Sequence, residues 1–344
     1  MKIVIDRNTP FVEGVFEPYA DVKYIDGKDI APDDICDADA LIIRTRARCS
    51  AELLASSPVR MIASASIDTD HIDMEYCSAK GIFVSKSDGS LSGGVANYVF
   101  SALYGLASRR SLDITGATIG IVGAGKTGER VAEFAQTLGF RVLKCDPVRA
   151  EAESDTRFCT LESLLNESQI VTMHVPLTSS TRGMCDAEFF VRMRPGAIFI
   201  NASHGEIMDE SALIAARAKL GAIIVDTWAT EPDVNRELLR VADIATPHIS
   251  GYSYQGKQRG TAMAVRSVAR FFGITPLFEF FPKAEMEELE AVKLSVKNRT
   301  QGEIASLFQY NYPVFTDDFL FRLNPGDFER IRGEYKYRRE FFLE

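Results

Sequence analysis

Short apolar runs, separated by polar segments that suit helices, dominate the first part of the chain. The runs cover residues 2–5, 22–25, 40–43, 61–63 and 82–84. Apolar runs of this length that alternate with helices are typical of buried parallel strands. The pattern therefore predicts an open α/β domain at the start of the chain.

A longer apolar-periodic stretch over residues 92–110 interrupts this series. Two arginines close it, and cations suit the C-terminus of a helix, so we interpret the stretch as a linker helix. A second α/β series follows it. Its predicted strands cover residues 118–122, 141–145, 170–174, 197–201 and 222–226, with helices over 129–138 and 209–220.

The end of the chain has a different character. A predicted helix over 257–272 leads into residues 273–282, which contain two prolines and mark a domain boundary. The segments beyond are rich in charged and aromatic residues. We therefore predict a discontinuous lid domain (1–92 with 256–282), a second α/β domain (93–255) and a C-terminal module (283–344).

Composition and charge narrow the possible partners. The net charge of −9 argues against nucleic acid or an anionic membrane, because both require a basic surface. The N-terminus has no signal-peptide pattern and no stretch is long and apolar enough to span a membrane, so a cytoplasmic location is expected. Six scattered cysteines without a C-x-x-C pair predict free thiols, and four histidines without a zinc motif predict no metal site.

A glycine-rich motif follows the predicted strand 118–122 and precedes a predicted helix. In this context glycines permit a tight turn and close approach to a pyrophosphate, which the helix N-terminus stabilises. Asp146 ends the next strand, where a carboxylate can accept hydrogen bonds from ribose hydroxyls and favours NAD over NADP. The motif residues are Gly123, Gly125, Lys126, Thr127 and Gly128, of which Lys126 is either a phosphate contact or an exposed surface lysine.

Two loops that follow later strands carry candidate acid/base chemistry. Glu231 and His248 lie on separate loops after strand-like segments, at the edge where open α/β sheets bind ligands. A histidine paired with a carboxylate can remove a hydroxyl proton, because the carboxylate orients the ring and stabilises the imidazolium. Asp226 ends a strand and could hydrogen-bond a carboxamide such as that of nicotinamide.

These motifs together resemble the D-2-hydroxyacid dehydrogenase family over residues 1 to about 275. The resemblance is carried by the glycine motif, the H-x-P-L segment 174–177, the D-x-W-x-x-E-P segment 226–232 and the P-H-I-x-G-Y segment 247–252. It implies a Rossmann dinucleotide-binding domain together with a flavodoxin-like α/β lid domain.

Within the family, three segments look most similar to the branch that oxidises 4-phospho-D-erythronate. They are residues 68–73, the run HISGYSYQGKQRGT and the run NPGDFERIRGEYKYRREF near the C-terminus. The resemblance implies NAD-dependent oxidation of that phosphorylated 2-hydroxy acid to the 2-oxo acid, in vitamin B6 synthesis. It also implies that the C-terminal module is a small α+β domain that forms a homodimer.

The resemblance assigns roles residue by residue. Glu231 and His248 become the acid/base pair, and His204 occupies a third catalytic position. The implied cofactor contacts beyond the glycine motif are Asp146, Val175, Asp226 and Gly251, and the implied substrate contacts are Thr45, Ser66 and Tyr252.

The chain departs from the family pattern at positions expected on the substrate side. His204 replaces an arginine that clamps the substrate carboxylate, and a mostly neutral imidazole cannot replace a guanidinium fork. Asp68 replaces a glycine, while Leu91 and Asn97 replace an asparagine and a glutamate. Arg44, Arg46 and Arg48 beside Thr45 either supply the missing cation or form an exposed loop face. Two alternatives stay open: action on another 2-hydroxy acid, and a NAD(H)-binding dimer with little turnover.

Overall fold

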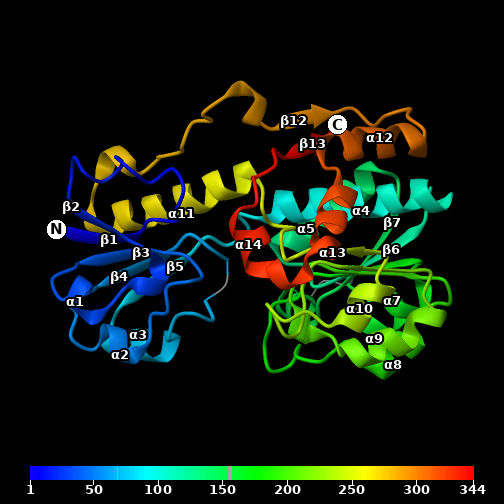
Figure 1. Ribbon diagram of the computed structural model, residues 1–344, viewed down its shortest axis with the longest axis horizontal. Helices are drawn as coiled ribbons and strands as arrows, with labels where there is room; N and C mark the ends of the chain where they lie inside the picture. The colour runs from blue at the N-terminus through cyan, green and yellow to red at the C-terminus, as the bar shows by residue number, and fades with distance from the viewer. Residues whose placement is uncertain (68, 154–156) are drawn as a thin grey trace. The chain divides into compact units, whose positions relative to one another are not determined.

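Two units make up the chain in the computed structural model, which describes residues 1–67, 69–153 and 157–344 (Figure 1). The first unit comprises Met1–Leu91 and Tyr254–Glu290, and the second comprises Ser92–Ser253 and Ala291–Glu344. The first unit is discontinuous, as the sequence suggests. The C-terminal segment, however, joins the second unit and is not a unit of its own.

The first unit is built on a five-stranded parallel sheet with the flavodoxin-like order β2-β1-β3-β4-β5. Successive side chains of its strands face opposite sides, and each side of the sheet carries a buried apolar cluster. Ile3 and Ile5 pack with helix α11, whereas Val4 packs on the opposite side with the short helices. The elements are β1 (Lys2–Asp6), β2 (Asp21–Ile25), β3 (Ala40–Ile43), β4 (Met61–Ser64), β5 (Phe83–Lys86), α1 (Pro32–Ile35), α2 (Ala51–Leu54), α3 (Met74–Lys80) and α11 (Tyr254–Phe272).

A six-stranded parallel sheet forms the second unit, in the order β11-β10-β9-β8-β6-β7. A parallel bridge between Lys144 and Phe158 adds one further position beyond β7, which completes the Rossmann order. The predicted Rossmann fold is therefore confirmed. The strands are β6 (Thr118–Val122), β7 (Arg141–Cys145), β8 (Ile170–Met173), β9 (Ile198–Asn201), β10 (Ala222–Val225) and β11 (Ile244–Ala245).

Helices cover both faces of this second sheet (Figure 1). Helix α4 packs on one face beside α5 and is buried almost all round, which explains why its sequence is apolar on every side. The opposite face carries α7 to α10. The helices are α4 (Ser92–Arg110), α5 (Lys126–Thr137), α6 (Pro147–Glu153), α7 (Leu161–Glu167), α8 (Ala187–Arg192), α9 (Glu210–Ala215) and α10 (Arg236–Val241).

The C-terminal segment wraps onto the second unit through its aromatic residues. Phe308 and Phe341 join the core beneath α4, whereas Phe321 and Phe328 join the core on the other face of the sheet. The aromatic residues that the sequence places in a separate C-terminal module therefore help to fill the cores of the Rossmann unit. The segment contains β12 (Val292–Leu294), α12 (Gln301–Asn311), α13 (Val314–Leu323), α14 (Phe328–Gly333) and β13 (Phe341–Leu343), and β12 pairs with β13 in parallel.

No helix in the described part of the chain is long and apolar enough to cross a membrane.

Candidate active site

The glycine-rich loop connects β6 to α5 in the second unit. Gly123 has a φ of 87°, and a Cβ there would lie 2.6 Å from the carbonyl oxygen of His174, so only glycine fits. A Cβ on Gly128 would overlap the carbonyl of Gly123. Gly125 is the N-cap of α5 and provides no side-chain cap, which leaves the first amides of the helix for a ligand.

This loop fits a dinucleotide pyrophosphate. No atom lies within 4 Å of a Cβ built on Gly125, so the space before the helix N-terminus is open. The uncapped amides and the helix dipole favour an anion at this point. Lys126 and Thr127 lie in the first turn of α5, where Lys126 is exposed and Thr127 is half-buried.

Asp146 lies directly after β7, beside the glycine loop. Its Oδ2 accepts a hydrogen bond of 2.9 Å from the amide of Ala124, and its Oδ1 accepts one of 3.0 Å from the amide of Arg149. The Arg149 guanidinium is paired with Glu129 at 2.6 Å and with Glu153 at 2.6 Å. Two carboxylates thus pair with the Arg149 guanidinium, while both oxygens of Asp146 accept hydrogen bonds from backbone amides at the position predicted for a ribose contact.

Val175 lies where the glycine loop crosses the end of β8. Its amide would be 2.8 Å from a Cβ on Gly123, which places Val175 against the motif as predicted for a cofactor contact. The preceding His174 is buried, and its Nε2 lies 2.9 Å from Thr172 Oγ1. Burial lowers the pKa of His174 to about 3, so this ring is neutral and structural.

Glu231 and His248, which the sequence predicts to be an acid/base pair, lie in direct contact. His248 Nδ1 lies 2.8 Å from Glu231 Oε2 and 3.1 Å from Oε1. The Glu231 Oε1 atom also accepts a 2.9 Å hydrogen bond from the amide of Trp228. Burial raises the pKa of Glu231, yet the hydrogen bond with His248 and smaller contributions from neighbouring donors and charges leave it below its ordinary value. An ionised Glu231 can only accept, so Nδ1 of His248 donates this hydrogen bond and Nε2 is the ring nitrogen that Glu231 does not contact.

Asp226 fixes the loop that bears His248. Its Oδ1 accepts hydrogen bonds from Thr246 Oγ1 at 2.6 Å and from the amide of Ile249 at 2.9 Å, and its Oδ2 accepts one from the amide of Ser250 at 2.9 Å. Asp226 is completely buried. His248 has a φ of 56°, an unfavourable conformation for a non-glycine residue that surrounding contacts must maintain. The geometry therefore favours a positioning role for Asp226, and its predicted contact with nicotinamide stays a prediction.

His204 follows β9 and lies next to the loop that carries Glu231. Its carbonyl accepts a 2.8 Å hydrogen bond from Asn201 Nδ2, which fixes the backbone at this corner. A Cβ on Gly205 would overlap the main chain of Trp228, so the two loops touch and only glycine fits between them. The structure thus brings His204 close to the acid/base loops, although an imidazole stands where the family has a guanidinium.

Gly251 and Tyr252 end the His248 loop. Gly251 is buried and Tyr252 is half-buried. The Tyr252 ring makes edge-to-face contacts with Tyr335 and Tyr337, at centroid distances of 6.1 and 6.0 Å. These tyrosines belong to the C-terminal segment, whose proximity to a predicted substrate residue the sequence analysis missed. The periodicity of that segment gives no signal for this contact, because it depends on how the segment folds back.

The two other predicted substrate residues belong to the first unit. Thr45 is exposed after β3 and Ser66 is half-buried after β4, so both follow the carboxyl ends of adjacent strands. Ser66 Oγ lies 2.6 Å from Ser64 Oγ. Thr45 lines a cavity of about 330 Å³ together with Arg48, Cys49, Ser50, Asp70, His71, Ile72 and Asp73.

The positions that depart from the family pattern have different environments. Asn97 is buried in α4, where its side chain exchanges two hydrogen bonds of 2.9 Å with the backbone of Phe341. The prediction that Asn97 lies on the substrate side is therefore wrong, because its side chain is hydrogen-bonded to β13. Leu91 is half-buried in a turn, and Asp68 lies outside the described residues. Arg44 donates a 2.7 Å hydrogen bond to the carbonyl of Asn8, and whether Arg44 or Arg46 acts on a substrate stays a prediction.

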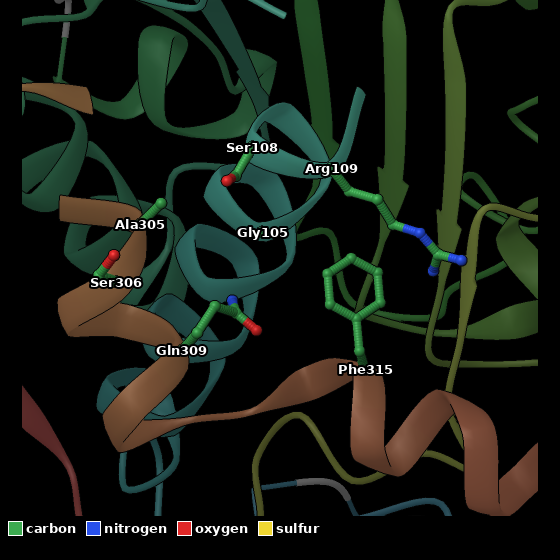
Figure 2. A pocket seen from close by; sticks show the side chains of 7 residues that line it. All are labelled: Gly105, Ser108, Arg109, Ala305, Ser306, Gln309 and Phe315. Carbon is green, nitrogen blue, oxygen red and sulfur yellow. The ribbon is translucent and has the colours of Figure 1, made fainter. Parts of the chain in front are cut away.

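A surface hollow of about 460 Å³ in the second unit lies apart from these residues. It opens between α4 and the C-terminal helices, with the ring of Phe315 beside the guanidinium of Arg109 (Figure 2). It is lined by Gly105, Ser108, Arg109, Ala305, Ser306, Gln309 and Phe315. No predicted site residue borders it, so it is not part of the candidate active site. Among the described residues, no group of three or more potential metal ligands is present.

Comparisons with known proteins agree with this geometry. Residues 101–250 match the family model of the D-isomer specific 2-hydroxyacid dehydrogenase NAD binding domain. Erythronate-4-phosphate dehydrogenase of Bacteroides fragilis is 40% identical over 99% of this chain and 97% of its own length. The protein of the same name from Yersinia enterocolitica is 34% identical over 99% of this chain and 93% of its own.

Solved structures show the same fold. D-lactate dehydrogenase from Aquifex aeolicus, complexed with NAD and lactic acid, matches with a TM-score of 0.67 at 23% identity. That match covers 83% of this chain and 100% of the other, so part of this chain has no counterpart there. With near full-length relatives at this level of identity, the chain belongs to the D-2-hydroxyacid dehydrogenase family.

Proposed function

We propose that this protein catalyses the NAD-dependent oxidation of 4-phospho-D-erythronate to 2-oxo-3-hydroxy-4-phosphobutanoate, in vitamin B6 synthesis. The observation that supports this most is the Glu231–His248 pair, with 2.8 Å between carboxylate and ring. The relatives named erythronate-4-phosphate dehydrogenase also match this chain nearly end to end. The sequence departs from the family at His204, but the acid/base pair and the glycine loop are intact.

The residues of the glycine loop would hold NAD. The open space at Gly125 and the amides of α5 suit the pyrophosphate, while Asp146 suits the adenosine ribose. Val175 and Gly251 are the further contacts we assign. Bound NAD supplies the acceptor for the hydride that leaves C2 of the substrate.

His248 removes the proton of the C2 hydroxyl. Because Nδ1 of His248 is hydrogen-bonded to Glu231, Nε2 is the atom that accepts the hydroxyl proton. The charge of Glu231 then stabilises the imidazolium as it forms. His174, beside the glycine loop, does not serve as this base, because burial keeps its ring neutral and its Nε2 lies against Thr172.

Thr45, Ser66, Tyr252 and His204 are the substrate contacts that we assign. A crystal structure of the enzyme with NADH and 4-phospho-D-erythronate tests all four together. A substrate bound without contact to Thr45, Ser66 and Tyr252 would remove them from the site, and a carboxylate bound far from His204 would remove that residue.

A steady-state assay with NAD and 4-phospho-D-erythronate tests the function, with NADH binding followed by fluorescence in parallel. We expect turnover that saturates with the phosphorylated acid. Turnover confined to other 2-hydroxy acids would replace the substrate assignment. NADH binding without turnover of any 2-hydroxy acid would favour a non-catalytic dimer.

We expect the enzyme to prefer NAD over NADP, because Asp146 would meet the 2′-phosphate with a like charge. Asp146→Ala should raise kcat/KM for NADP by about tenfold or more, which corresponds to roughly 1.4 kcal/mol of relieved repulsion. Asp113→Ala, at an exposed carboxylate before β6, is the matched control and should leave the preference unchanged. Equal use of both cofactors by the wild type would end this assignment.

We also propose that the protein is a homodimer formed through its C-terminal segment. Although five of the eleven aromatics of the segment are buried, α12 and α13 expose large apolar side chains: Tyr310 at 81%, Phe319 at 60%, Leu320 at 50% and Leu323 at 57%. An apolar surface of this kind is typical of an interface, and a two-fold interface uses it in both subunits.

Charged substitutions on α13 test the dimer. Phe319→Glu combined with Leu323→Glu should weaken association by about 100-fold or more, because burial of one such side chain is worth roughly 1.5–3 kcal/mol. Val191→Glu, at an equally exposed apolar residue of α8, is the control. Sedimentation equilibrium should find the double variant monomeric and the control dimeric. A double variant that remains dimeric would place the interface elsewhere.

A further inference from the structure

An arginine of the C-terminal segment reaches the loop that carries the acid/base histidine. Arg332 lies in α14, and its guanidinium carbon is 5.7 Å from the centre of the Tyr252 ring. This cation–π contact, together with the edge-on contacts of Tyr335 and Tyr337, joins Tyr252 to the C-terminal segment. Burial raises the pKa of Glu231, whereas His248, the amide of Trp228 and, as a smaller contribution, the charge of Arg332 lower it.

Arg332 differs from Arg322, Arg330 and Arg338 of the same segment, because no described carboxylate pairs with it. Arg322 pairs with Asp318, Arg330 with Asp327, and Arg338 with Asp317. Among the described residues, no carboxylate forms an ion pair with Arg332, and its Nε is buried without a hydrogen-bond acceptor. Because an unsatisfied buried donor is costly, and more so on a charged group, an anion brought by a ligand is the natural partner for this guanidinium.

The substrate of the proposed function carries two anionic groups, a carboxylate next to C2 and a phosphate at C4. A phosphate carries the larger charge and three acceptor oxygens, which suit a guanidinium fork.

We propose that Arg332 binds the phosphate of the substrate and makes the enzyme specific for a phosphorylated 2-hydroxy acid. This inference rests on the proposed function. Tyr252 positions the guanidinium from one side, and the buried Nε offers a fixed donor. Arg332 takes no part in proton transfer; it determines specificity through binding.

The test uses Arg332→Gln and Arg332→Lys, with Arg330→Gln as the matched control. Arg330 lies on the same helix but is paired with Asp327 at 2.6 Å and is exposed. We expect Arg332→Gln to raise KM for 4-phospho-D-erythronate about 10- to 100-fold, as for the loss of one charge-assisted hydrogen bond, with kcat changed only a few-fold. Arg332→Lys should recover part of the loss, and Arg330→Gln should match the wild type.

D-erythronate, which lacks the phosphate, is the second substrate in each assay. Calorimetry of both acids binding to the NADH-loaded enzyme compares the phosphorylated with the unphosphorylated acid without turnover. Arg332→Gln should leave the affinity for D-erythronate unchanged. An equal loss of affinity for both acids would overturn the proposal, as would an unchanged KM for 4-phospho-D-erythronate in Arg332→Gln. A lower kcat with a displaced pH profile would also overturn it, because it would indicate that Arg332 acts through Glu231. A wild type that does not oxidise 4-phospho-D-erythronate would instead overturn the proposed function.

Discussion

His248→Asn is expected to remove nearly all turnover, about 10³-fold or more in kcat, which lies within the range for loss of a general base. Asparagine has no basic nitrogen, so the C2 hydroxyl proton has no acceptor at the position of Nε2. The affinity for NADH should change by only a few-fold, because the glycine loop and Asp146 lie on other loops. Steady-state kinetics and NADH fluorescence measure the two quantities separately. Full activity of the variant would contradict the assignment of His248.

Glu231→Gln complements this prediction through its pH dependence. Glutamine still accepts the hydrogen bond from Nδ1 but has no charge to stabilise the imidazolium. The protonated form of His248 is therefore less favoured in the variant, and the acidic limb of kcat/KM should move to lower pH by about one unit. The maximal rate should fall as well. Glu237→Gln, at an exposed carboxylate of α10, is the control, and an acidic limb that does not move in Glu231→Gln would separate Glu231 from proton transfer.

Elements with strong local patterns are predicted well by the sequence. The strands 118–122 and 141–145 and the helix 92–110 agree with β6, β7 and α4 to the residue. The first is a continuous apolar run, the second lies between Gly139 and Pro147, and the helix is a long apolar stretch closed by two arginines. The two-residue strand β11 has no pattern of its own, and its position depends on pairing with β10. The C-terminal segment shows the same limit, since only tertiary packing reveals that its phenylalanines fill the cores of the Rossmann unit.

The candidate site divides along similar lines. Glu231, His248 and the glycine loop carry recognisable motifs, and the structure places the Glu231 carboxylate 2.8 Å from the His248 ring. The contact between Arg332 and Tyr252 has no motif, because it joins residues far apart in the chain. The hydrogen bonds of Asp226 depend on the direction of a buried side chain, which spacing alone does not specify.

Asp226→Asn is expected to lower both stability and activity, because the amide group replaces one carboxylate oxygen with a donor that faces other donors. At least one of the buried groups, the amides of Ile249 and Ser250 or the hydroxyl of Thr246, then loses its acceptor. Such a loss costs about 1–3 kcal/mol. The loop that carries His248 in its left-handed conformation would relax, and a displacement near 1 Å can reduce kcat about 100-fold.

Asp243→Asn is the matched control for this prediction. Asp243 has a side chain only 7% exposed, accepts a 2.8 Å hydrogen bond from the amide of Ile223 and pairs with Arg110 and Arg217 away from the acid/base loops. Its substitution should lower the melting temperature without reducing kcat. Hydrogen exchange of the Ile249 and Ser250 amides should accelerate only in Asp226→Asn, while NADH affinity stays near that of the wild type. If Asp226→Asn instead weakens NADH binding and leaves these amides protected, Asp226 contacts the nicotinamide and does not act by holding the loop.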